Sequence, residues 1–294
     1  MINTVAHGID ASFKMTVRKF PEVIEVTVKP VNHMLELARS RSQGLRKAPM
    51  PESLKPELEE DERARKDEEN KTRAIRRAKQ SIRWLIHRLM ADHLVTLTYR
   101  DNMQDTEQLK RDFDQFRRLM LARYPDWKYV AVREHQERGA WHLHLAVQGR
   151  QDLKYMRTCW YKVLGCANAT GKDVLGQIDV VGPRKRFGQP KGTWKSAKLA
   201  CYLTKYLDKC FDMHEHSSKR YWSSKGAPKP EVTHHWLGSK NITEMIKDTF
   251  DIAMLHGLED FPAQIMQSRD RTLLWLSGAR NVKLSFITDI DFIT

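Results

Sequence analysis

The pattern of apolar and polar residues is sharpest in the middle of the chain. His93 to Tyr99 is a short run rich in β-branched residues, which is typical of a buried strand. Residues 128–134, 141–148 and 176–181 have a similar strand-like character. The four residues 136–139, between the second and third of these strands, predict a hairpin turn.

Helical spacing of apolar residues predicts helices between and after these strands. Residues 105–124 place Leu109, Phe113 and Phe116 on one face, and further helices are expected at residues 152–164 and 195–211. The resulting order is β-α-β-β-α-β-α. It predicts an α+β fold in which an antiparallel sheet carries helices on one face.

The flanking regions have a weaker pattern. Residues 23–28 alternate like a short strand, and an acidic run followed by a basic run over residues 57–88 predicts a long charged helix. Near the C-terminus, helices are expected at residues 242–255 and 261–276, with a terminal strand after them. Both flanking regions are therefore interpreted as largely helical extensions.

These elements divide the chain into three expected parts. The first, residues 1–92, is an N-terminal extension with a short strand, a linker and the charged helix. Residues 93–225 form the central domain. Residues 226–294 form a mainly helical accessory region.

Composition adds a strong positive charge to this picture. The chain has 51 Lys and Arg against 37 Asp and Glu, a formal net charge of +14. Such a field suits a polyanion, and nucleic acid is favoured over an anionic membrane surface. No apolar run approaches the length of a membrane span, and the first residues lack the apolar core of a secretory signal. We expect a cytoplasmic protein with no membrane partner.

The four cysteines narrow the possible metal sites. They are Cys159, Cys166, Cys201 and Cys210, and none belongs to a Cys-x-x-Cys pair. This spacing argues against a cysteine-rich zinc site and favours reduced thiols.

Two histidines occupy alternate positions of the expected strand at residues 141–148. Strand residues two apart share a face, so His142 and His144 project together. Paired imidazoles suit a divalent metal with open coordination positions. Glu134 on the adjacent strand is the first candidate for a third ligand, with His135 and Gln136 as alternatives. The other interpretation is a partly exposed strand with two ordinary histidines, but unsatisfied imidazoles in an apolar strand are costly.

A Tyr-x-x-Lys pattern occurs twice in the helix expected at residues 195–211. Tyr202 and Tyr206 are four residues apart, as are Lys205 and Lys209, and this spacing stacks each pair on one helix face. A phenol has a pKa near ~10 and needs a nearby cation, or a metal on its target, to act as a nucleophile. Attack on a phosphodiester would form a phosphotyrosine linkage and free a sugar hydroxyl. The alternative is a core helix whose tyrosines pack and whose lysines reach solvent.

Clusters of basic and aromatic residues flank this helix. Such clusters hold single strands by neutralising phosphates and stacking bases, although a solvated loop has the same composition. The clusters consist of Arg184, Lys185, Arg186, Phe187, Lys191, Trp194 and Lys195 before the helix, and Lys219, Arg220, Tyr221, Trp222 and Lys225 after it. The basic face between Arg73 and Arg88 is either a duplex-binding surface or a solvated helix face.

Three motifs, in order, resemble those of HUH endonucleases, in the branch of rolling-circle replication initiators from single-stranded DNA phages and plasmids. Residues 94–99 (LVTLTY) are similar to the first, strand-forming motif. Glu134 with residues 141–145 (WHLHL) resembles the metal motif, and residues 202–209 resemble the two-tyrosine form of the third motif. The resemblance covers roughly residues 93 to 225. The turn residues 138–141 (RGAW) depart from the family pattern.

The resemblance implies an RRM-like core and a specific chemistry. It implies that His142, His144 and Glu134 hold Mg²⁺ or Mn²⁺, and that Tyr202 or Tyr206 attacks a scissile phosphate and stays on the 5′ end. The released 3′-OH would prime synthesis, and the second tyrosine would later close the displaced strand into a circle. Lys205 and Lys209 would contact the phosphate or the metal region.

The implied partners follow from the same resemblance. They are single-stranded DNA at a replication origin, a host helicase and a DNA polymerase. A separate helicase is expected because the glycine-containing segment 188–196 does not meet the phosphate-loop pattern.

Other functions remain open from the sequence. A single-strand transposase or a relaxase would use the same chemistry on another DNA substrate. A non-catalytic RRM-like protein would bind without cutting, although RNP-type aromatic residues are missing from the strands. A metal-dependent hydrolase would use an activated water and form no covalent adduct.

Overall fold

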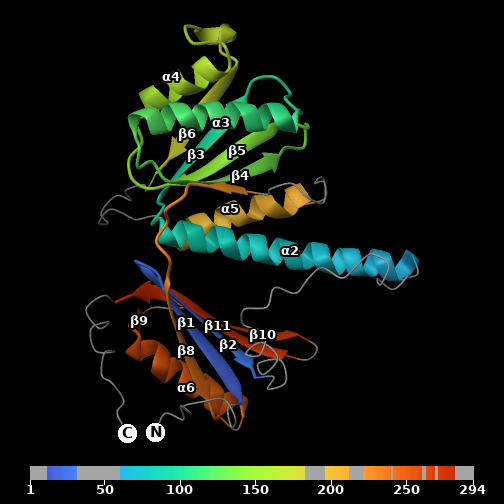
Figure 1. Ribbon diagram of the computed structural model, residues 1–294, viewed down its shortest axis with the longest axis vertical. Coiled ribbons are helices and arrows are strands. Elements are labelled where there is room, and N and C mark those ends of the chain that lie inside the picture. The colour runs from blue at the N-terminus through green and yellow to red at the C-terminus, as the bar shows by residue number, and fades with distance from the viewer. Residues whose placement is uncertain are drawn as a thin grey trace, which may run out of the picture. The chain divides into compact units, whose positions relative to one another are not determined.

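The computed structural model shows two compact units (Figure 1). Residues 58–228 form the larger unit, and residues 1–57 and 229–294 together form the other. This division differs from the expected three parts, because strands from both ends of the chain pair in one sheet. The structure describes residues 12–31, 60–182, 196–211, 221–239, 241–259, 263–268 and 271–281.

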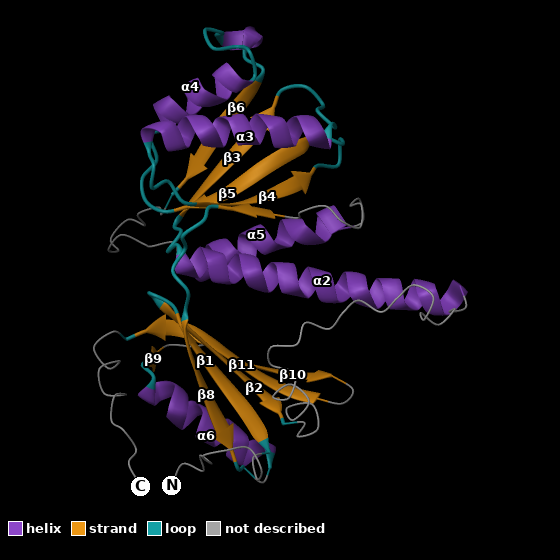
Figure 2. Cartoon of the chain, in the orientation of Figure 1, coloured by secondary structure: helices purple, strands orange, loops and turns teal. Residues whose placement is uncertain are grey.

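The larger unit contains a five-stranded antiparallel sheet in the order β6-β3-β5-β4-β7 (Figure 2). Four of the strands match the sequence prediction, and the short edge strand β7 adds to them. The strands are β3 (His93–Tyr99), β4 (Tyr129–His135), β5 (Trp141–Val147), β6 (Gly176–Val181) and β7 (Tyr221–Ser223). A short 3₁₀ helix, η2 (Gly171–Asp173), precedes β6.

The β4–β5 hairpin turns where the sequence predicts it. The Gly139 amide donates a hydrogen bond to the Gln136 carbonyl at 2.9 Å. Gly139 has a φ of 91°, a left-handed conformation that glycine adopts without steric cost. This turn sets β4 against β5 so that Glu134 lies opposite His142.

Helices α3 (Thr106–Arg123) and α4 (Leu153–Val163) cover one face of this sheet. The side chain of Asp105 caps α3 by accepting hydrogen bonds from two backbone amides of its first turn. The apolar side of α3 packs with alternate residues of β5 and with α4 around Trp160, which is fully buried. This layer agrees with the predicted α+β arrangement.

The opposite face of the sheet also carries helices, which the sequence analysis did not foresee. Helix α5 (Ser196–Phe211) buries Leu199, Ala200 and Leu203 against β4, and α2 (Glu60–Arg88) adds Ile82 and Ile86 to the same cluster. Only the second half of α2 contributes buried residues, as its apolar spacing indicates. The helix assigned to the N-terminal extension therefore belongs to the larger unit.

The smaller unit is built on a second antiparallel sheet, in the order β10-β11-β2-β1-β8, with β9 paired to β11. Helix α6 (Ile242–Leu255) packs on one face through residues such as Met245 and Ile252. The strands are β1 (Phe13–Lys19), β2 (Val23–Pro30), β8 (Glu231–Leu237), β9 (Leu258–Glu259), β10 (Ala263–Ser268) and β11 (Arg271–Arg280).

The prediction of a helix at residues 261–276 is wrong, and the C-terminal region is not mainly helical. Strands β10 and β11 occupy that segment. Leu274 and Leu276 lie opposite Val28 and Val26 of β2 and are buried with them. Pairing with a strand more than two hundred residues away thus decides a segment whose local spacing is ambiguous. Among the described residues, no helix is long and apolar enough to cross a membrane.

Candidate active site

The two histidines lie on the sheet face that α5 covers. In β5, Trp141, Leu143 and Leu145 point to the α3–α4 core, so the alternate residues His142 and His144 point the other way. The pair register places Thr96 of β3 and Val132 of β4 on either side of His144. Both imidazoles are buried, with exposed fractions of 8% and 5%. The predicted common face is therefore present.

Both ring nitrogens of His144 are engaged. The Nε2 atom lies 2.6 Å from Oε2 of Glu134, and the Nδ1 atom lies 3.2 Å from Oγ1 of Thr96. A carboxylate only accepts, so Nε2–H donates to Glu134, and in the neutral ring the Thr96 hydroxyl then donates to Nδ1. The strand neighbours on either side thereby fix the orientation of this imidazole.

His142 is held from one side only. The Gln136 amide Nε2 lies 3.0 Å from His142 Nδ1, whereas His142 Nε2 is buried and has no hydrogen-bond partner within the described part of the chain. Burial lowers the pKa of this imidazole, and neighbouring His144 lowers it further, while Glu134 acts in the opposite direction. The neutral ring thus presents a buried nitrogen that nothing in the described structure satisfies.

The tyrosine pair meets the histidine face. The Tyr206 ring stacks on the His144 ring with centroids 4.2 Å apart and an interplanar angle of 9°. Tyr202, one turn earlier, packs edge-on against Tyr206 at 5.1 Å and is 37% exposed. The spacing of four residues puts both phenols on the side of α5 that faces the sheet. Two motifs about sixty residues apart in sequence therefore come together.

The environment of Tyr206 keeps its phenol protonated. Burial raises the pKa of Tyr206 well above the ordinary value of 10, and contact with Tyr202 and the nearby Glu134 carboxylate raise it further. Lys205 is exposed on α5, and Lys209 lies in the same helix with a side chain outside the described part. The described surroundings of Tyr206 therefore oppose formation of the phenolate.

The expected metal ligands lie close together but do not form a preassembled cation site. Within the described ranges, no group of three or more His, Cys, Asp or Glu side chains is arranged to hold a metal ion. Glu134 directly binds the Nε2 atom of His144. The alternative third ligand His135 packs edge-on against Trp141 at 4.8 Å, and Gln136 contacts His142. The metal assignment stays a prediction.

Most of the expected DNA-contacting residues cannot be placed. Within the second cluster, Tyr221 and Trp222 lie in β7 and Lys225 follows that strand. The remaining members of both clusters lie outside the described residues, namely Arg184, Lys185, Arg186, Phe187, Lys191, Trp194, Lys195, Lys219 and Arg220.

Two further contacts were missed at the level of sequence. Thr96 reaches His144, and its signal was a polar residue that alternates with buried Val95 and Leu97 in β3. Nδ1 of His87, at the end of α2, lies 2.8 Å from Oγ of Ser196, the first residue of α5, and both side chains are buried. No local pattern links these two, because the contact joins elements more than one hundred residues apart.

The comparisons with known proteins agree with this region of the molecule. Residues 92–211, from the start of β3 to the end of α5, match the family model of replication-associated proteins of the ORF2 type. No curated protein and no solved structure matches the chain. The matched segment spans less than half of the chain, but it contains the histidine pair, Glu134 and both tyrosines. This segment is similar to a replication-associated protein family, which is consistent with a replication initiator.

Proposed function

We propose that the protein initiates rolling-circle DNA replication by cutting one DNA strand at a specific site through a 5′-phosphotyrosine intermediate. The observation that carries this proposal is the stack of Tyr206 on His144. It brings a candidate nucleophile and a candidate metal-binding face to one point on the sheet. The similarity of this segment to replication-associated proteins supports the biological context.

The chemistry follows from the tyrosine pair. The phenolic oxygen of Tyr206 or Tyr202 attacks the scissile phosphorus, and the bond from phosphorus to the 3′ oxygen breaks. The phenol loses its proton to a base or to water, and the departing 3′ oxygen takes up a proton. Because the phosphotyrosine bond replaces one phosphodiester bond with another, a 3′-OH can later attack it and rejoin the strand. Two tyrosines allow a second cut after one round of copying.

We further propose that His142, His144 and Glu134 hold Mg²⁺ or Mn²⁺. Buried polar nitrogens normally have a partner, and His142 Nε2 has none within the described residues. The hydrogen bond between Glu134 and His144 keeps a carboxylate and an imidazole together beside it. When bound, a divalent ion supplies polarisation of the phosphate oxygens and offsets developing charge.

The remaining residues and partners have expected roles. Lys205 and Lys209 are proposed to contact the phosphate, which requires α5 to approach the DNA backbone. The formal charge of +14 favours a polyanionic substrate, and single-stranded DNA at an origin is the proposed one. A host helicase and a polymerase would unwind and copy the duplex.

Covalent trapping tests the proposal. The intact protein is incubated with a labelled pool of single-stranded oligonucleotides and Mn²⁺, and the products are separated on a denaturing gel. We expect a labelled protein adduct that disappears in the double variant Tyr202→Phe, Tyr206→Phe. Tyr161→Phe, in α4 on the other side of the sheet, is the matched control and should form the adduct normally.

The other outcomes separate the competing functions. An adduct that persists in the double phenylalanine variant contradicts the tyrosine assignment. Cleavage without an adduct indicates a hydrolase that uses water. Binding without cleavage indicates a non-catalytic nucleic-acid-binding protein.

A further inference from the structure

A wide groove lies in the larger unit between α3 and the edge of the sheet formed by β4 and β7. Its volume is about 1070 Å³, and its walls come mainly from one side of α3, the residues that precede and begin β4, and the short strand β7. None of these residues belongs to the histidine–tyrosine site. The groove is therefore a separate feature of the same unit.

Aromatic rings form a continuous row along this groove. Phe113 of α3 contacts both Trp222 of β7 and Tyr129 of β4, with ring centroids 5.4 Å apart in each pair. Tyr129 in turn lies 5.0 Å from Trp127 at an angle of 32°. Phe113, Tyr129 and Trp127 are buried core residues, but Trp222 is only partly buried. Trp222 is thus the ring of this row that a ligand can reach.

The rim of the groove is positively charged. Lys110, Arg117, Lys128 and Lys225 line it, and Asp114 is the carboxylate among the lining residues. Asp114 is bonded to Arg117 and Arg118, and Lys110 is paired with Glu107 at 2.5 Å. Lys128 and Lys225 make no ion pair within the part of the chain that the structure describes. Their charges remain available to an anion.

The two available lysines lie on the same part of the rim. The Lys128 ammonium is 3.5 Å from the position that a Cβ atom would take on Gly226, the residue after Lys225. Behind them, the guanidinium carbon of Arg133 lies 5.2 Å from the centre of the Trp222 ring. A partly exposed indole therefore stands beside two cations without acidic partners in the described structure.

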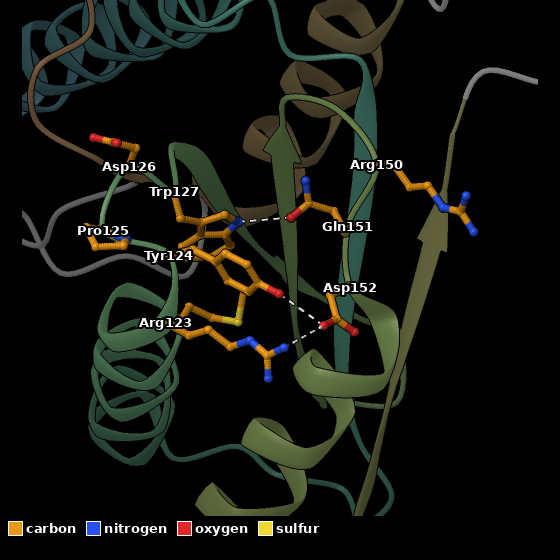
Figure 3. A pocket seen from close by; sticks show the side chains of 9 residues that line it. Arg123, Tyr124, Pro125, Asp126, Trp127, Arg150, Gln151 and Asp152 are labelled. Atoms are coloured by element: carbon orange, nitrogen blue, oxygen red, sulfur yellow. Dashed lines mark hydrogen bonds and ion pairs between the residues drawn. The ribbon is translucent and has the colours of Figure 1, made fainter.

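The groove continues past its end into a second hollow of about 440 Å³ (Figure 3). The two share Pro125 and Trp127 as lining residues. In the hollow, Trp127 donates a hydrogen bond to Gln151, and Arg123 is paired with Asp152 at 3.7 Å. Figure 3 shows Trp127 and Tyr124 lying along this wall. The combined track is long enough for an extended chain rather than a compact ligand.

Strand β7 connects this track to the histidine–tyrosine site. Tyr221 pairs with Val132, and Val132 pairs on its other side with His144, so Tyr221 lies two strand spacings, about 10 Å, from His144. Tyr221 belongs to the cluster under α5, whereas the next residue, Trp222, faces the α3 side. A strand that leaves the histidine face over this edge arrives in the groove.

We propose that the groove binds the single-stranded DNA that flanks the cleavage site, with Lys128 and Lys225 on its phosphates and Trp222 against a base. This inference rests on the proposed function for the identity of the strand. Phosphate neutralisation beside an accessible aromatic ring is the arrangement that grips single strands without reading their sequence. Charge complementarity favours DNA over a peptide added to the β7 edge.

Binding measured without cleavage tests the groove. Fluorescence polarisation with an oligothymidine long enough to span both sites is recorded in EDTA, so that no cutting occurs. For the double variant Lys128→Glu, Lys225→Glu, we expect affinity to fall about tenfold and the slope of log affinity against log salt to shrink by about 1.4, or about 0.7 for each phosphate that is no longer neutralised. The matched control is Lys154→Glu with Lys172→Glu. It makes the same charge change on exposed residues of α4 and η2, toward the opposite, β6 edge.

A tryptophan series tests the stacking contact. Trp222→Leu should weaken binding about fivefold or more, and Trp222→Phe should restore most of the loss, because stacking needs a ring. Circular dichroism checks that each variant is folded. Equal loss of affinity in the groove pair and the control pair would overturn the proposal, as would unchanged binding in both.

The result is independent of the nicking assignment. If the wild type forms no phosphotyrosine adduct but the groove pair still loses affinity selectively, the proposed function fails and the groove stands. If the adduct forms and the groove pair binds like the wild type, the groove assignment fails alone. Selective loss of duplex binding only would also contradict it.

Discussion

At the scale of single residues, His144 is the best-defined group of the candidate site. Thr96 and Glu134 hold its two nitrogens, and the Tyr206 ring covers its face. A side chain so constrained does not need to reorganise before it acts, which favours a binding or catalytic role. His142 differs because only Gln136 holds it within the described structure.

Thr96 offers a test of the proposed metal site that spares the ligands themselves. Removing a hydrogen-bond partner of a metal-binding histidine typically costs about 10–100-fold in metal affinity or activity. We therefore expect Thr96→Val to raise the Mn²⁺ concentration for half-maximal adduct formation by a factor in that range. Titration of adduct yield against Mn²⁺ measures the effect.

The control for this experiment lies on the same strand and face. Thr98 donates weakly to the Gln177 carbonyl at 3.4 Å rather than to a histidine, so Thr98→Val should leave the Mn²⁺ requirement unchanged. An identical requirement in both valine variants would show that the Thr96 hydroxyl does not orient a ligand.

The residue patterns predicted this geometry only in part. Alternation in β5 placed both histidines on one face, and the spacing of four in α5 placed both tyrosines on another. Neither pattern determines whether those faces meet, because that depends on how β5 and α5 pack. Likewise, the pairing of Glu134 with His142 follows from the hairpin register, which a single turn residue more or less would reverse.

At the scale of elements, α5 joins the candidate chemistry to the core. One side buries Leu199, Ala200 and Leu203 against β4 and α2, and the other side bears Tyr202 and Lys205. The contact between His87 and Ser196 ties the first turn of α5 to the last turn of α2. The tyrosines are thereby held on a rigid helix rather than on a loop.

In the smaller unit, a pair of buried histidines links β8 to the end of α6. His235 Nε2 and His256 Nε2 are 2.7 Å apart, and Lys19 of β1 contributes positive charge nearby. Burial is the main cause of the lowered pKa of both imidazoles, and it brings the pKa of His256 to about 4. Both rings are therefore neutral at physiological pH.

This pair makes the unit sensitive to acid. The unfolded His256 takes up a proton near pH 6.5, whereas the folded residue does so only near pH 4, so the unfolded state binds more protons between these values. We expect the free energy of unfolding to be fully retained above pH 6.5 and to fall by about 3 kcal/mol on acidification to pH 4. Urea unfolding at several pH values measures this change.

Two measurements separate His256 from other groups. His256→Gln removes the titrating ring and should flatten the pH dependence of unfolding in this range. An NMR titration should place the imidazole pKa near 4. A His256 resonance that titrates near 6.5 would contradict the predicted sensitivity.

At the scale of the whole molecule, two units of similar design divide the chain. Each combines an antiparallel sheet with helices, which confirms the predicted α+β class. The larger unit is one continuous segment and contains the histidines, the tyrosines and the groove. The smaller unit is assembled from both ends of the chain.

The continuity of the larger unit leads to a prediction about a fragment. Its two apolar clusters are complete within residues 58–228, so we expect this fragment alone to fold. It should also form the DNA adduct in Mn²⁺ with a yield similar to that of the full chain. Circular dichroism reports folding, and a denaturing gel reports the adduct.

The comparison needs one further control. The same fragment with Tyr202→Phe and Tyr206→Phe should fold but form no adduct. A folded wild-type fragment without an adduct, beside an active full chain, would show that the smaller unit contributes directly to the reaction.

By itself, the sequence determined the faces: which residues of β5 and α5 project together, where the β4–β5 turn lies, and that the chain carries an excess of positive charge. The tertiary structure alone decided which faces meet. It set Tyr206 on His144, placed α2 and α5 on the second side of the sheet, and turned a segment of ambiguous spacing into β10 and β11. The physical reason is that periodicity is a local property of the chain, whereas pairing and packing depend on partners distant in sequence.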